Sequence, residues 1–256
     1  MNRDAAAVYV LWLRAMKRFL RSPSQIIGSV AMPFLFLIFL GAGFSGVKFP
    51  GVPSNVSYID FLVPGILGMS MLFAATTAGI SLLWDRQFGF LKEVMVAPVQ
   101  RISIMLGRTF GGITTAFLQS LLLIIFALFI GFRVSSIAGL FAAFGFMLLI
   151  GLVFISLGLI LASIMTDMQG FGLILNLLIF PLFFLSGAIY PVNALPAAIR
   201  YITYANPLTY GVDGMRGALI GVSVMPEWLD ALILVFIALV MLGIGAYAFS
   251  KSKVTI

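Results

Sequence analysis

Long apolar runs separated by short polar segments dominate the hydrophobic pattern of this chain. Crossing a bilayer core of about 30 Å takes about 20 apolar residues in a helix. Runs of this kind cover residues 26–44, 61–84, 104–131, 137–165, 170–190 and 229–249. Because backbone polar groups in lipid must be satisfied internally, each run is predicted to be an α-helix. The pattern predicts an all-α integral membrane protein, with six transmembrane helices in one domain, 1–256.

The segment 1–25 has the pattern of an amphipathic helix. One helical face has Arg14, Lys17, Arg18 and Arg21, and the opposite face has Val8, Trp12, Met16 and Phe19. Such a pattern is typical of a helix that lies in the headgroup layer of a membrane. The same charges also fit the general excess of Lys and Arg on the cytoplasmic side, and both interpretations can hold together.

Composition supports a membrane setting and removes several kinds of chemistry. The chain is 62% hydrophobic and 9% charged, whereas soluble domains are about 45–50% apolar and about 25% charged. It has no Cys and no His, so disulfides, thiolate sites and histidine ligands are excluded and no metal site is predicted. The eight acids are scattered among loops, which gives no paired-carboxylate catalytic site.

The distribution of basic residues predicts orientation rather than a nucleic-acid partner. The chain has 15 Lys and Arg against 8 Asp and Glu. Six spans place 11 of the basic residues on one side, namely Arg3, Arg14, Lys17, Arg18, Arg21, Arg86, Lys92, Arg101, Arg108, Lys251 and Lys253. The other side has 4, namely Lys48, Arg133, Arg200 and Arg216. Since the more basic side faces the cytoplasm, both termini are predicted to be cytoplasmic, with the protein in the cell membrane.

The loop 85–98 is too apolar to be a simple solvated connection. Apolar residues at roughly helical spacing lie among charged ones, in the set Asp85, Arg86, Phe88, Leu91, Lys92, Glu93 and Met95. Pro98 is expected to end the helix. A short helix of this kind suits docking into a groove on another protein, although it could equally rest on its own membrane domain.

The segment 191–228 is moderately apolar but a poor membrane span. Asn206-Pro207 breaks it, and Asp213 and Arg216 interrupt it. The two charged residues are three positions apart and could pair on one helix face. The segment is either a set of short helices that re-enter the membrane or a surface helix outside it.

Two of these segments resemble a known family. The run Asp85–Glu93, followed by Ala97-Pro98 and Arg101, resembles the first cytoplasmic loop of type-2 ATP-binding-cassette exporter permeases, such as the daunorubicin-resistance and nodulation-factor permeases. The stretches Phe184–Pro191 and Asn206–Gly217 are similar to the extracytoplasmic signature of that family. Members often carry an acid where this chain has Gln87.

The resemblance implies partners and roles for particular residues. The segment 85–98 would be the coupling helix that docks on a separate ATPase subunit, which would bind the ATP and Mg. The permease would pair with itself or with a related chain. The family's path runs between two permeases and is lined largely by spans two and five, so Thr76, Thr77 and Asn176 become candidate path residues. The segment 191–228 would hold the short re-entrant helices before the last span.

Motifs that the sequence lacks help to distinguish an ATP-driven permease from an enzyme and from an ion-coupled transporter. The chain has no G-x-x-x-x-G-K-[ST] phosphate loop, so it is predicted not to be an enzyme and to rely on a partner for ATP hydrolysis. We expect no clearly buried ionisable residue in the spans, which argues against a secondary, ion-coupled transporter. The few polar residues in the spans favour a lipophilic drug, as in multidrug resistance, or a lipid-like cargo. A polysaccharide or glycolipid exporter of the same family is the alternative.

Overall fold

The computed structural model describes residues 3–44, 46–47, 53 and 56–251, and the regular structure in these residues is helical. The elements are α1 (Arg3–Leu20), α2 (Pro23–Gly43), α3 (Tyr58–Gln87), α4 (Phe90–Val96), α5 (Arg101–Ile130), α6 (Ile137–Ile164), α7 (Met168–Phe184), a 3-10 turn (Val192–Ala194), α8 (Ala197–Tyr204), α9 (Pro207–Ile220) and α10 (Glu227–Lys251). The all-α class predicted from the sequence is confirmed.

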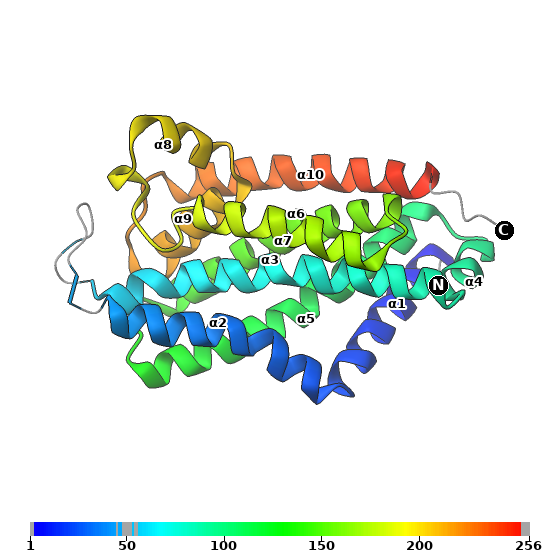
Figure 1. The fold of residues 1–256 in the computed structure, drawn as a ribbon, viewed down its shortest axis with the longest axis horizontal. Helices are drawn as coiled ribbons and strands as arrows, with labels where there is room; N and C mark the ends of the chain where they lie inside the picture. The colour runs from blue at the N-terminus through cyan, green and yellow to red at the C-terminus, as the bar shows by residue number, and fades with distance from the viewer. Residues whose placement is uncertain (1–2, 45, 48–52, 54–55, 252–256) are drawn as a thin grey trace.

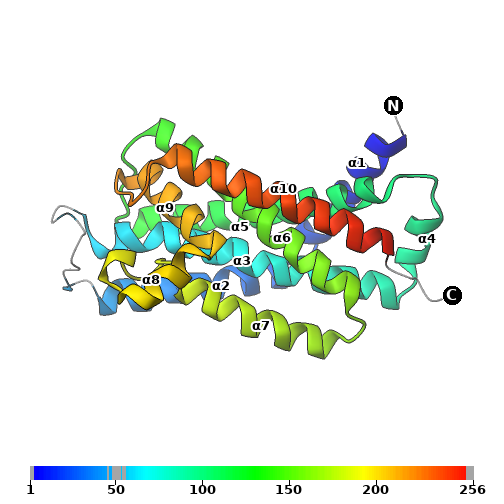
Figure 2. The ribbon, with the colours of Figure 1, turned by 90° about the horizontal axis from the view of Figure 1, so that it is seen from above.

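The helices α2, α3, α5, α6, α7 and α10 run along the long axis of the molecule (Figures 1 and 2). The centre of this bundle is formed by α3 and α6, since 67% of the most apolar stretch of each is buried. The corresponding share is 39% in α5, 22% in α2 and 17% in α10. The outer helices therefore turn much of their apolar surface outward, as expected for helices that meet lipid.

Glycines allow the two central helices to approach closely. A Cβ atom at Gly158 of α6 would overlap the backbone of Ala75 on α3. One turn further along α3, a Cβ atom at Gly79 would overlap the ring of Phe171 on α7 and the backbone of Gly158. Small residues at helix contacts are the usual means of close packing in membranes, where van der Waals contact replaces the hydrophobic effect between helices.

The amphipathic helix α1 packs on α5. Figure 1 shows α1 running obliquely to the other helices. Its Leu11 and Ala15 lie over Gly107 and Gly111 of α5, where a Cβ atom would be crowded. The indole Nε1 of Trp12 also donates a 3.0 Å hydrogen bond to Thr114. The predicted helix is present, and one side of it is held by the protein itself.

The two ends of the bundle carry different elements. The N-terminal part of α1, α4 and the end of α10 lie at one end, and α8, α9 and the connection between α5 and α6 lie at the other (Figures 1 and 2). Arg133, Arg200 and Arg216, which the sequence assigned to the less basic side, all lie on the elements of this second end. Lys48 of the same group and Lys253 of the other group lie outside the described residues.

In the described part of the chain, five helices are long and apolar enough to cross a membrane, namely α2, α3, α5, α6 and α10. The apolar helix α7 has 17 residues and is shorter than the predicted span 170–190. It ends at Phe184 because the next N–H groups turn back to the carbonyls of Pro181 and Phe183. The chain then turns at Gly187, whose φ of 75° favours glycine. A sixth span stays a prediction.

Candidate functional site

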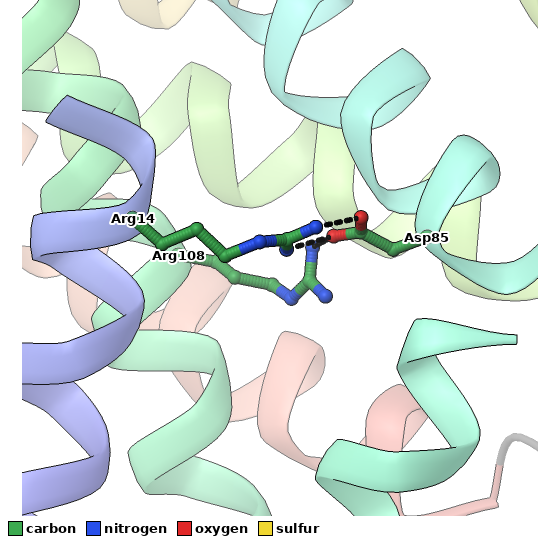
Figure 3. Close-up of polar contacts among 3 residues, drawn as sticks. All are labelled: Arg14, Asp85 and Arg108. Carbon is green, nitrogen blue, oxygen red and sulfur yellow. Dashed lines mark hydrogen bonds and ion pairs between the residues drawn. The ribbon is translucent and has the colours of Figure 1, made fainter. Parts of the chain in front are cut away.

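An ion cluster joins α1, α3 and α5 at the end of the bundle that carries α4 (Figure 3). Two nitrogens of Arg14 donate to the two carboxylate oxygens of Asp85 at 2.8 and 2.7 Å. Arg108 Nη1 lies 2.9 Å from Oδ2 of the same carboxylate. The side chains of Asp85 and Arg108 are 5% and 8% exposed, and that of Arg14 is 38% exposed. One buried carboxylate is therefore shared by two guanidinium groups.

The cluster changes the predicted extent of the coupling helix. The segment 85–98 was expected to form one cytoplasmic element, but Asp85 and Arg86 belong to the last turn of α3, which continues to Gln87. Asp85 is turned into the protein by its two arginines, so its carboxylate is not available at the surface. Arg86 Nη1 donates to the carbonyl of Met165 at 3.2 Å and thereby caps the end of α6.

The short helix α4 combines an anchored side with an exposed one. Gly89 precedes α4 with a φ of 80°, which lets the chain reverse after α3. Leu91 is 3% exposed and anchors α4 on the bundle, whereas Phe88 is 79% exposed and Glu93 is also exposed. The side chains of Lys92 and Met95, also predicted for this site, lie outside the described part of the structure. Phe88, Val96 and the acid Glu93 thus all face outward on α4 and the turn before it.

The three candidate path residues lie in different surroundings. Thr76 on α3 is partly buried, and within the described residues its hydroxyl oxygen has no hydrogen-bond partner. Thr77 lines a cavity between α1, α3 and α5. Asn176 on α7 is exposed on the outside of the bundle, near Leu173 and Leu177, which are 72% and 77% exposed. The single chain thus does not bring Asn176 together with the two threonines.

At the opposite end, the predicted Asn206-Pro207 break starts α9. The Asn206 side chain accepts the N–H of Leu208 at 3.0 Å and donates to the carbonyl of Leu182 at 2.6 Å. Pro207 occupies the first helical position, where a missing N–H costs nothing. The break is therefore a helix cap that also ties α9 to the end of α7.

Asp213 and Arg216 are buried on α9 but do not form the predicted ion pair with each other. Asp213 accepts the backbone N–H groups of Val224 and Met225 at 2.8–3.0 Å. Arg216 donates to the carbonyl of Gly187 at 3.0 Å and lies over the ring of Phe61, 3.7 Å from its centroid. Burial lowers the pKa of Arg216 to about 10, and the charge of Asp213 opposes that shift. The guanidinium thus stays charged at neutral pH and links three segments.

Sequence reasoning missed two buried charged groups. Asp230 on α10 has 0% exposure, and within the described residues neither of its carboxylate oxygens has a hydrogen-bond partner. The expectation of no clearly buried ionisable residue in the spans was therefore wrong for Asp230, and also for Arg108. Both residues lie within predicted spans, and a charge at such a position is the signal that could have found them, because it needs a partner or a cavity. The ionisable content of the spans therefore no longer argues against ion-coupled transport.

Long apolar helices around a closely packed centre define this chain as a membrane-type helical bundle, and the comparisons with known proteins give its family. The family model described as "ABC-2 type transporter" matches residues 6–220, so the chain belongs to the ABC-2 type transporter family.

Relatives with curated names agree with that family. The chain is similar to "Putative transport permease ycf38" of Cyanophora paradoxa, with 29% identity over 82% of this chain and 72% of the relative. It is similar to "Nodulation protein J" of Rhizobium meliloti, with 30% identity over 77% of this chain and 75% of the relative. It is also similar to "Inner membrane transport permease YadH" of Escherichia coli K12, with 26% identity over 86% of this chain and 85% of the relative. Membership of this family, rather than the content of the spans, is the evidence that the chain is a transport permease.

Proposed function

We propose that this chain is the membrane-spanning permease subunit of an ATP-driven exporter and that it couples to a separate ABC ATPase subunit through α4. The observation that carries this proposal is the exposed side of α4. Phe88, in the turn that leads into α4, is 79% exposed, and Val96, the last residue of α4, is 84% exposed, so α4 and the turn before it present apolar side chains at the end of a membrane bundle. Burying these side chains against a partner would remove them from water.

The contacts of α4 explain how a push on it would reach the membrane helices. Its Leu91 is buried against the bundle, and its Phe90 ring stacks under the guanidinium of Arg14, at 3.6 Å. Arg14 is in turn bonded to Asp85 at the end of α3. Movement of α4 by a closing pair of ATPase subunits would therefore act on α1 and α3 together.

The proposal includes an orientation and a second permease chain. Six spans, with α7 and the turn after it as the fifth, place α1, α4 and the end of α10 in the cytoplasm, in agreement with the 11-to-4 division of basic residues. The outer face of α7 carries Asn176 among exposed leucines. A polar side chain in an apolar helix is better placed against protein or a path than against lipid, which favours a second permease beside α7 and a path along this face.

The proposed cargo is a lipophilic drug or a lipid-like molecule. Exposed large apolar residues predominate on α7, with Leu173, Leu177 and Phe180 as examples. A path bordered by such side chains would hold an apolar molecule better than a long hydrated polysaccharide.

Purification of the chain from its native membranes tests the central part of the proposal. We expect a polypeptide with a phosphate-loop sequence to be recovered in a fixed ratio, and ATP to drive efflux of a lipophilic fluorescent dye from vesicles that contain the complex. Phe88→Asp places a charge in the proposed contact and should reduce recovery of the ATPase about tenfold or more.

Tyr201→Asp is the matched control, because Tyr201 is 78% exposed and lies on α8 at the opposite end of the bundle (Figure 1). This variant should recover the ATPase at the normal level. Absence of any ATPase from the preparation, or equal recovery with both variants, would contradict docking through α4.

A further inference from the structure

A cavity of about 70 Å³ lies beside the ion cluster, between α1, α3, α5 and the start of α2. One buried water needs roughly 15 Å³ of such space, so the cavity has room for a group considerably larger than one water. Its lining is unusually polar for a membrane bundle and includes Thr77, Ser81, Thr115, Gln119 and Gln25.

The charges around the cavity are unbalanced. Arg14, Arg18 and Arg108 all line it, and Asp85 is the one carboxylate among its described lining residues. Asp85 is already engaged by Arg14 and Arg108. The lining therefore carries three positive groups against one negative group, with Arg108 buried and Arg18 exposed, and such a surplus of positive charge attracts an anion.

Arg108 shows where a compensating group is missing. Its side chain is 8% exposed, and only Nη1 faces Asp85. Within the described residues, the buried Nε and Nη2 atoms of Arg108 have no hydrogen-bond partner. Figure 3 shows this second edge of the guanidinium turned away from Asp85. Leaving buried donors unsatisfied costs about 1–3 kcal/mol each, so the structure has a place for an acceptor at this edge.

We propose that this cavity is a binding site for a phosphate group, held by Arg108 and Arg18. Nε and Nη2 of a guanidinium form the planar fork that matches two oxygens of a phosphate. Gln119 and Thr115, which line the same cavity, are polar side chains that can bond to the remaining oxygens. The site is separate from the proposed ATPase contact on α4, and its test does not depend on export.

The phosphate can come from an anionic lipid headgroup or from a free anion. Arg18 is exposed whereas Arg108 is buried, so the cavity runs from the surface of α1 toward the centre of the bundle. Leu20 and Ile27, on the two sides of the turn between α1 and α2, are 64% and 69% exposed. Acyl chains could follow these apolar residues while the headgroup enters between Arg18 and Arg108, which favours the lipid.

Binding to the full chain, purified in detergent and depleted of lipid, tests the proposal. Phosphatidylglycerol is compared with phosphatidylcholine by native mass spectrometry, and inorganic phosphate is compared with chloride at equal ionic strength by thermal unfolding. We expect one phosphatidylglycerol per chain with a clear preference over phosphatidylcholine. Arg108→Gln should weaken binding about tenfold, as for loss of a charge-assisted hydrogen-bond pair.

Arg18→Gln keeps the test decisive if Arg108→Gln does not fold, because Arg18 is exposed. It should also weaken binding, and Lys17→Gln, an equal charge change at an exposed neighbour outside the cavity lining, should not. Binding of phosphatidylglycerol alone identifies a lipid headgroup site, and stabilisation by inorganic phosphate alone identifies a free-anion site. Binding of neither probe, or equal weakening by Lys17→Gln and Arg18→Gln, overturns the proposal.

Discussion

The guanidinium of Arg14 lies over the ring of Phe90, with 3.6 Å between its Cζ atom and the ring centroid. Arg14 is on α1 and Phe90 is the first residue of α4, so the contact joins the amphipathic helix to the short helix after α3. The two terminal nitrogens of the same guanidinium donate to the carboxylate of Asp85. A single side chain thereby holds the relative positions of three helices at the end of the bundle where coupling is proposed.

The stacking of Arg14 on Phe90 should be measurable by a double-mutant cycle. Phe90→Leu removes the ring, Arg14→Gln removes the charge, and the double variant removes both. We expect a coupling free energy of about 0.5–1 kcal/mol, because Arg14 is partly exposed. Thermal unfolding of the four proteins in the same detergent gives the cycle, and strictly additive changes would show that the contact adds no stability.

The carboxylate of Asp85, which two arginines share, should contribute more to the free energy of unfolding than an exposed carboxylate does. Asp85→Asn removes the only negative group of the cluster and leaves Arg14 and Arg108 close together at a largely buried site. We expect a destabilisation of about 3–5 kcal/mol, as for breaking a buried ion pair. The control is Glu93→Gln, an exposed acid on α4, which should change stability by less than about 0.5 kcal/mol. Comparable unfolding temperatures for the two variants would argue against the cluster.

Local patterns predicted the helices of this fold but not the contacts between them. The break at Asn206-Pro207 and the amphipathic α1 depend on residues close in sequence, and both were predicted from local patterns, although the role of Asn206 as a helix cap was not. The pairing of Asp85 with Arg108 depends on how α3 and α5 pack, and no local pattern encodes that packing. For the same reason the sequence placed Asp85 in the coupling segment and paired Asp213 with Arg216, whereas tertiary contacts gave each of these side chains other partners.

Close packing of α3 on α6 predicts opposite effects for two glycine substitutions on α6. Gly158→Ala adds a Cβ that overlaps the backbone of Ala75, so the helices must separate at a cost of about 1–3 kcal/mol. At Gly145 an added Cβ meets no atom within 4 Å, and Gly145→Ala should be neutral or stabilise by up to about 1 kcal/mol through helix propensity. Thermal unfolding distinguishes them, and a harmless Gly158→Ala would contradict the packing.

Arg216 should be structurally important at the end of the bundle that carries α8 and α9. Arg216→Gln removes the bond to the Gly187 carbonyl and the stacking on Phe61. We expect a loss of about 2–3 kcal/mol, as for a buried charged hydrogen-bond donor. Arg133→Gln is the control, since Arg133 is exposed near the same end. Limited proteolysis of the segment after α7 should become faster in Arg216→Gln only; equal rates in both variants would exclude this role.

The outward position of Asn176 makes its proposed role in the path separable from a role in folding. Asn176 is exposed on α7, so Asn176→Leu removes no packed side chain and should leave the unfolding temperature of the single permease unchanged or slightly raised. If the side chain borders the path between two permeases, the substitution should lower ATP-driven dye efflux roughly fivefold, in keeping with one lost hydrogen bond. Leu177→Ile, at a neighbouring exposed position, should leave efflux unchanged. Normal efflux with Asn176→Leu, measured in vesicles with equal amounts of assembled complex, would place Asn176 against lipid and remove it from the path.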